Sequence, residues 1–341
     1  YSERSNMTPV WKGPLNDGIT QSLINKYLTC PYRFFLYAGL GLEEPRQLHP
    51  NLIWGDTFHK GLELLIEKDK PQKDLSPEEW DEVIQKTNKH LKEKFPTAPG
   101  SFIHTIKRML ALYDDRYKGS QKFHTEVEFR EPYETTNGYK VTLRGKVDAL
   151  SHDRHTLVEH KCKGKIDQVQ TSKEVPVDHQ VLLYCYITTA RTVVYDLIMI
   201  PEAQWMLPAR RPSQTNDNWA EQLFTSTSGE KFPIAQKKHH WVQQIGPLEI
   251  NESQIYEFRA FTLDPIIERM YKWFEHVSQP DFDHTNPKFY NEHFYRVPVR
   301  HFDPGKTEIF KCDYFDYLTG SGDLDDLVPV KGFYQELSTE E

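Results

Sequence analysis

Apolar residues recur at helical spacing through the first third of the chain. The stretch GITQSLINKYLTCPYRFFLYAGL predicts a helix capped near Thr20 and interrupted by Pro31, with an aromatic-rich piece after it. The same spacing predicts helices over about 51–68, about 78–94 and about 101–118, and the second of these follows the start signal SPEE. The front of the chain is therefore expected to be helical.

The period changes from helical to alternating after residue 120. KFHTEVEFREPYETTNGYKVTLRGKVDALS holds two alternating runs joined around Asn137 and Gly138, which predicts a β-hairpin, and TLVEHKC predicts a third strand. A helix over about 177–190 then leads into VVYDLIMI, an apolar run typical of a buried central strand. This order of elements indicates an α/β core.

The patterns divide the chain into four segments. A helical part covers 1–120 and the α/β core covers 121–205. Residues 206–250 are polar and lack a regular pattern of apolar positions, which predicts an insertion or long loop. Residues 251–341 are expected to form a long helix, kinked at Pro265, and an irregular segment packing on the core.

Composition excludes several classes of protein. With 341 residues, of which 38% are hydrophobic and 13% aromatic, the chain can bury a large core in one or two domains. It has no apolar run long enough for a membrane span, and YSERSNMTPVW lacks a signal-peptide pattern, so we expect a cytoplasmic protein without membrane contact. A net charge of -8 means that any nucleic-acid binding must use local basic patches.

One constellation of charged residues points to chemistry. In LVEHKCKGK, Glu159 and Lys161 are two residues apart on a strand and so share a face. Asp148 lies near the end of the hairpin arm expected to pair with that strand. Two neighbouring carboxylates suit Mg²⁺ or Mn²⁺, and an adjacent ammonium could orient or deprotonate an attacking water.

The order of four short motifs resembles a known family. Gly55 to His59 in GDTFH precede Asp148 in GKVDAL and the EHK triplet, and Gln180 to Tyr184 follow in QVLLY. This order resembles the RecB-like branch of the PD-(D/E)XK nuclease superfamily and is similar to CRISPR-adaptation and phage exonucleases. TQSLINKYLTCPYRFF is also similar to the opening helix of that branch.

The resemblance implies a fold and a function. The fold would be a restriction-endonuclease-like core, a mixed β-sheet flanked by helices. The function would be metal-dependent cleavage of DNA, in the form of an exonuclease acting on ends or single strands in recombination, repair, phage metabolism or defence, within a bacterial or phage-infected cell. The implied metal ligands are His59, Asp148 and Glu159, Lys161 is the implied catalytic lysine, and Gln180 and Tyr184 would support the site, contact DNA or simply pack.

The cysteines depart from the family pattern. Many members of the branch hold an iron–sulfur cluster through four cysteines. Cys30 and Cys312 stand where two of these would lie, but Cys162 and Cys185 fall inside core elements. The sequence therefore argues against an iron–sulfur cluster, and the absence of CxxC spacing argues against a disulfide framework and a tetrathiolate zinc site.

Simpler interpretations stay open for several charged residues. Glu159 and Lys161 could form a surface salt bridge on an edge strand. His59 could be a helix histidine satisfied by Glu63 at i+4, or Glu63 could orient it as a metal ligand. Glu128 could add a carboxylate to the site or belong to a solvated strand face.

Basic residues beside aromatic ones are the candidates for DNA contact. They are Lys163 and Lys165, which follow the strand of Glu159 and Lys161, and Arg33 in CPYRFF. A second hypothesis is that the chain is a non-catalytic or partner-dependent DNA-binding subunit of a larger helicase–nuclease or defence complex. No GxxxxGK[ST] loop occurs, so a helicase motor would be a separate chain.

Overall fold

The chain forms two compact units. This computed structural model describes residues 9–43, 49–68, 70, 74–117, 123–164, 166–201, 241–280, 282 and 328–329 of the 341. Unit 1 contains the described parts of Tyr1–Gln47, Glu128–Gly145 and Ser253–Glu341. Unit 2 contains those of Leu48–Val127 and Lys146–Glu252.

A five-stranded mixed sheet runs in the order β2-β3-β4-β5-β6. β3 and β4 pair antiparallel, β4 and β5 pair parallel, and β5 and β6 pair antiparallel. β2 and β3 are joined by a turn in which Gly138 takes a φ of 85°, a left-handed conformation that glycine adopts without strain. The strands are β2 (Phe123–Glu134), β3 (Lys140–Ser151), β4 (Thr156–Lys163), β5 (Thr192–Met199) and β6 (Val242–Glu249).

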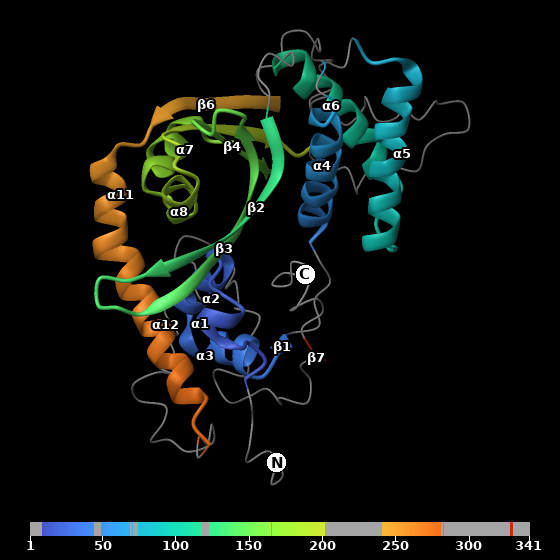
Figure 1. Cartoon of the computed structure of the whole chain (residues 1–341). Helices are drawn as coiled ribbons and strands as arrows, with labels where there is room; N and C mark the ends of the chain where they lie inside the picture. The colour runs from blue at the N-terminus through green and yellow to red at the C-terminus, as the bar shows by residue number, and fades with distance from the viewer. Residues whose placement is uncertain are drawn as a thin grey trace. The chain divides into compact units, whose positions relative to one another are not determined.

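The parallel pair β4 and β5 requires a crossover, and helices supply it. The connection contains α7 (Gln168–Glu174), a 3₁₀ turn at Val175–Val177 and α8 (His179–Thr188). Figure 1 shows α7 and α8 within the curve of the sheet, and α7 contacts β6. The predicted helix over 177–190 corresponds to α8, whereas α7 was not predicted.

Three further helices of unit 2 pack on one another around an apolar cluster. They are α4 (Pro50–Ile66), α5 (Pro77–Lys94) and α6 (Phe102–Tyr117). The ends of β5 and β6 close this cluster, whose buried members include Trp54, Phe58, Leu91, Ile106, Leu110, Ile198 and Val242. α5 begins at the predicted signal, where Ser76 and Glu79 form a complete capping box.

Unit 1 is built around aromatic side chains. The rings of Trp11 and Phe34 both contact Trp273, with centroids 6.2 and 4.7 Å from it. Buried Asp264 accepts hydrogen bonds from the Tyr133 hydroxyl and from the backbone N–H and hydroxyl of Thr136. The elements are α1 (Gly13–Asn16), α2 (Gln21–Thr29), α3 (Pro31–Phe34), a π-helical turn at Phe35–Gly39, β1 (Leu42–Glu43) paired with β7 (Val328–Pro329), α11 (Glu252–Phe258), a second π-helical turn at Arg259–Leu263 and α12 (Asp264–Val277).

The predicted fold class is confirmed, because a mixed sheet is flanked by helices. One boundary was wrong: the segment 206–250 was expected to be an insertion or loop, but its last residues form edge strand β6. The sequence VQQIGPLE contains Gly and Pro, and its apolar and polar residues alternate only weakly, so its local preference for a strand is weak. Pairing with β5 nevertheless gives it a strand conformation. Residues 206–240 of that segment, and 283–327, lie outside the described residues.

Candidate metal-dependent active site

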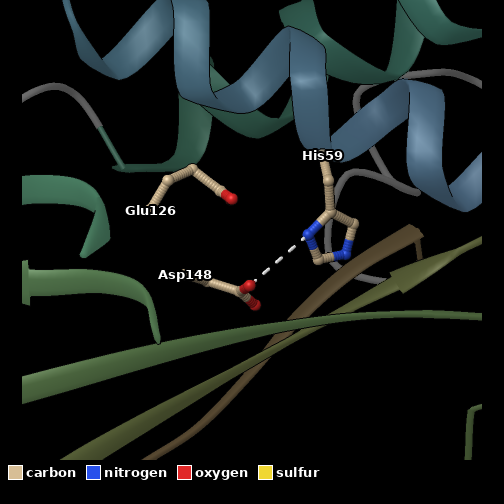
Figure 2. A group of neighbouring side chains, drawn as sticks. All are labelled: His59, Glu126 and Asp148. Atoms are coloured by element: carbon tan, nitrogen blue, oxygen red, sulfur yellow. Dashed lines mark ion pairs between the residues drawn. The ribbon is translucent and has the colours of Figure 1, made fainter. Parts of the chain in front are cut away.

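Helix α4 brings His59 to the sheet through a close contact. Gly55 and His59 are four residues apart and so lie on one face of the helix. A Cβ on Gly55 would lie 3.4 Å from the Cβ of Cys162 on β4. One turn farther along, the Nδ1 atom of His59 lies 3.7 Å from Oδ1 of Asp148 on β3 (Figure 2).

Asp148 lies where β3 runs beside β4. The register pairs Ala149 with Val158, and the adjacent Asp148 uses its Oδ2 to accept the backbone N–H of His160 at 2.7 Å. Burial would raise the pKa of Asp148, but the hydrogen bond and charge of His59, with the N–H of His160, lower it. The carboxylate is therefore charged at neutral pH.

The contact with Asp148 raises the pKa of His59. Burial would lower its pKa, but Asp148 and Cys162 raise it well above its ordinary value. A histidine binds a metal ion through a neutral imidazole nitrogen, so a cation at Asp148 would displace the proton of His59.

A second group of side chains joins β4 to α8. Asp178 caps α8 by accepting the backbone N–H of Gln180 at 2.7 Å, which orients the first turn of the helix. The Gln180 amide donates to Oε1 of Glu159 at 2.7 Å and accepts from the ammonium of Lys161 at 3.2 Å. Lys161 also forms an ion pair with the same Glu159 oxygen. Tyr184, one turn along α8, accepts from Gln180 at 3.2 Å.

Glu159 is nearly inaccessible to solvent, with 2% exposed. Burial and the nearby charge of Asp148 raise its pKa to about 7, against the lowering effect of Lys161 and His59. The carboxylate in turn raises the pKa of Lys161, although burial acts against it. Its second oxygen, Oε2, is buried and has no hydrogen-bond partner among the described residues.

The structure brings a third potential ligand to His59 and Asp148. One side-chain atom from each of His59, Glu126 and Asp148 lies within 4.8 Å of the others, as Figure 2 shows for the three side chains. One imidazole nitrogen and two carboxylate oxygens form a donor set that suits Mn²⁺ or Mg²⁺. Glu126 also forms an ion pair with Lys146 of β3.

Glu128 was the glutamate of β2 predicted to add a carboxylate, whereas the described group of potential ligands contains Glu126. Glu128 is exposed, belongs to unit 1 and is not a member of the described ligand group. Glu126 has a φ of 51°, a left-handed conformation that interrupts regular alternation along β2. Regular alternation along β2 therefore does not predict which of its glutamates faces His59 and Asp148.

Glu63, predicted beside His59, pairs with Lys60 in the described structure, and its role at His59 stays a prediction. Glu63 accepts both of its charged hydrogen bonds from Lys60, at 2.7 Å to each carboxylate oxygen. The two residues are three apart on α4, a spacing that favours side-chain ion pairs. In the described structure the carboxylate that forms an ion pair with His59 is that of Asp148.

A buried polar group behind the site was not predicted at all. His160 lies between the catalytic candidates Glu159 and Lys161 in sequence. Its ring contacts Tyr113 of α6 and Asp196 of β5. Burial lowers the pKa of His160 to about 4, so the ring is neutral at neutral pH. These partners are 47 and 36 positions away, a distance at which periodicity carries no information.

The remaining predicted residues stay predictions. Lys163 lies at the end of β4, whereas Lys165 lies outside the described residues. Arg33 lies on α3 in unit 1. The thiols of Cys30, Cys162 and Cys185 are free, and Cys312 lies outside the described residues.

Comparison with known proteins identifies the family. Residues 19–258, more than half of the chain, match the PD-(D/E)XK nuclease superfamily. The chain belongs to this superfamily. Within this PD-(D/E)XK nuclease, the predicted His59, Asp148, Glu159 and Lys161 all lie in unit 2 and near one another.

Two individual proteins resemble this PD-(D/E)XK chain. It is 27% identical over 182 residues to an ATP-dependent helicase/deoxyribonuclease subunit from Oenococcus oeni, a match that covers 42% of this chain and 16% of that protein. The chain thus spans about a sixth of the length of this relative. A phage-related exonuclease from Haemophilus somnus is a structural neighbour with 10% identity and a TM-score of 0.31, covering 63% of this chain and 93% of that one.

Of the helices in the described part of the chain, none is both long and apolar enough to cross a membrane.

Proposed function

We propose that this chain is a divalent-metal-dependent deoxyribonuclease that hydrolyses phosphodiester bonds with Mg²⁺ or Mn²⁺. Membership of the PD-(D/E)XK nuclease superfamily supports cleavage of nucleic acid. The observation that carries the proposal is the approach of His59, Glu126 and Asp148 to within liganding distance beside the Glu159–Lys161 pair. An exonuclease acting on DNA ends or single strands is the favoured form, by resemblance to the RecB-like branch.

The residues fit such a cation. His59, Glu126 and Asp148 offer one ligand atom each, and the unpartnered Oε2 of buried Glu159 supplies a further acceptor that a cation would satisfy. When bound, a divalent ion of this kind lowers the pKa of a water molecule and stabilises the negative charge that develops at phosphorus.

Lys161 acts as a charged donor in this proposal. Its raised pKa keeps the ammonium protonated, and Glu159 and Gln180 hold it in place. A protonated lysine beside the reacting phosphate orients the attacking water and offsets developing negative charge. Gln180 positions both members of the pair, because one amide donates to the carboxylate and accepts from the ammonium.

A requirement for a partner is the second candidate. The Oenococcus oeni relative is by name one subunit of a helicase/deoxyribonuclease, and this chain covers 16% of it. In that case cleavage would need a helicase or another complex subunit supplied as a separate chain. Either form would act on DNA in the cytoplasm of a bacterial or phage-infected cell.

Digestion of end-labelled DNA tests the proposal. Single- and double-stranded substrates are incubated with the native chain in Mn²⁺, Mg²⁺ or EDTA, and with the variants Lys161→Ala and Lys89→Ala. Lys89 is a matched control because it is an exposed lysine of α5, 72% accessible, paired with Glu93. We expect metal-dependent stepwise shortening by the native chain and by Lys89→Ala, and none by Lys161→Ala.

Other results would redirect the proposal. Cleavage that persists in EDTA would contradict the metal-dependent mechanism, and cleavage by Lys161→Ala would contradict the role of Lys161 as a charged donor. DNA binding without cleavage under any metal would favour the partner-dependent subunit.

A further inference from the structure

A chain of buried hydrogen bonds leads from the site into the core of unit 2. The hydroxyl of Tyr113 donates to Oδ2 of Asp196 at 2.9 Å and lies 3.0 Å from Nε2 of His160. His160 Nε2 is also 3.5 Å from Asp196. His160 and Asp196 are 3% and 1% exposed, so these groups interact with each other and not with solvent.

The donors and acceptors of this network fix the His160 ring. A tyrosine hydroxyl has one hydrogen, and here it goes to the Asp196 carboxylate. Nε2 of His160 must then donate to the tyrosine oxygen. A ring held at one nitrogen between two buried partners has little freedom to rotate, which keeps its other nitrogen beside the carboxylate of Asp148.

The peptide of His160 is the contact that matters for the site. Its backbone N–H donates to Oδ2 of Asp148 at 2.7 Å, and the ring Nδ1 lies 3.8 Å from the same oxygen. Oδ1 of Asp148, the other oxygen, faces His59. Holding Oδ2 at the peptide therefore directs Oδ1 toward the ligand group.

We propose that Tyr113 and Asp196 are positioning residues that, through His160, hold the Asp148 carboxylate in the orientation in which it binds the catalytic cation. The inference rests on the proposed metal-dependent function and deepens it. Mutation of a partner one step removed from a metal ligand, as His160 is here, typically weakens metal binding about 10- to 100-fold, and Tyr113 and Asp196 hold that partner.

Direct measurement of Mn²⁺ binding tests the proposal without DNA. The full chain, freed of metal, is titrated with Mn²⁺, and free ion is followed by electron paramagnetic resonance. We expect Tyr113→Phe and Asp196→Asn to raise the Mn²⁺ dissociation constant about 10- to 100-fold. In the nuclease assay, raising the Mn²⁺ concentration should restore much of their cleavage.

Unit 1 offers a matched control. Tyr133→Phe likewise removes a buried hydrogen bond from a tyrosine hydroxyl to a carboxylate, that of Asp264. This variant should lose stability but bind Mn²⁺ as the native chain does. Circular dichroism and thermal melting establish that each variant is folded.

The outcomes separate this inference from the proposed function. If the native chain binds no Mn²⁺, the metal-dependent function itself fails. If the native chain binds Mn²⁺ and folded Tyr113→Phe and Asp196→Asn bind it equally well, only the positioning role fails. Failure of both variants to fold would also overturn it, because the network would then maintain the core and not the direction of one carboxylate.

Discussion

Gly55 and Cys162 set the distance between helix α4 and strand β4. A Cβ on Gly55 would just touch that of Cys162 at 3.4 Å, so the position has room for one methyl group and no more. We expect Gly55→Ala to be tolerated, since alanine also favours the helix by about 1 kcal/mol over glycine. Gly55→Val should push α4 away and move His59.

The two substitutions differ in size at a single site and so control for each other. A displacement of about 1 Å at a catalytic group can cost about 100-fold in rate, so we expect a loss of that order for Gly55→Val. Cleavage rate at saturating Mn²⁺ measures the effect. Equal rates for both variants would show that the close contact does not position His59.

Substitutions at Glu126 and Glu128 test which glutamate of β2 belongs to the ligand group. Glu126→Gln removes a charged ligand and should weaken Mn²⁺ binding at least about 10-fold, as is typical for perturbation of a metal site. Glu128→Gln makes the same chemical change at an exposed position and should leave binding unaltered. Mn²⁺ titration measures the affinity of both variants. If Glu128→Gln weakens binding and Glu126→Gln does not, the ligand is Glu128, as the sequence predicted.

Gln180 joins the carboxylate and the ammonium of the site through one amide. Gln180→Leu removes its donor to Glu159 and its acceptor for Lys161, so we expect kcat to fall about 10- to 100-fold with the fold intact. Gln170→Leu on α7 removes an exposed amide that bonds Glu174 at 2.9 Å and should leave kcat unchanged. Similar rates for both variants would mean that Gln180 only packs.

Ser76 affects stability alone. Its hydroxyl accepts the backbone N–H of Glu79 at the start of α5, and Ser76→Ala should lower the free energy of unfolding by about 1 kcal/mol. Urea denaturation measures the change. Cleavage activity should be native, because the cap belongs to α5 and not to the site.

Glu159 should make the stability of the metal-free chain depend on pH. Its pKa is raised from the ordinary 4.5 to about 7, so the folded chain holds the proton more tightly than the unfolded chain. This contribution to stability is complete below pH 4.5 and is lost as the pH rises through 7.

Thermal melts in EDTA test that sign. The melting temperature of the native chain should fall more between pH 4.5 and pH 7 than that of Glu159→Gln, which cannot titrate. Added Mn²⁺ at pH 7 should raise the melting temperature of the native chain, because a cation takes over the role of the proton. An identical pH profile for the two proteins would mean that Glu159 is charged throughout this range.

Local signals in the sequence predicted most of the helices and strands. Thr20 and Ser76 cap α2 and α5 as expected, because capping depends only on the next three residues. The hairpin turn at Gly138 is local in the same way. The placement of His59, Asp148, Glu159 and Lys161 followed from the order of motifs within one family.

The misses all depend on information that is not local. The left-handed backbone at Glu126 changes which side chain faces the ligands, and β6 acquires its strand conformation by pairing with β5. Tyr113 meets Asp196 across 83 positions, a pairing set by the packing of α6 against the sheet. Pattern reasoning within a window of a dozen residues cannot reach such contacts.

The order of the two units along the chain bears on synthesis at the ribosome. Each unit draws on separate stretches of the chain, and the last stretch of unit 2 ends at Glu252, before α12 has been translated. The ligand-bearing unit can thus assemble while the helix that carries Trp273 and Asp264 still lies in the exit tunnel. Nascent chains stalled shortly past Glu252 would then expose the unfinished apolar surface of unit 1 until α12 emerges.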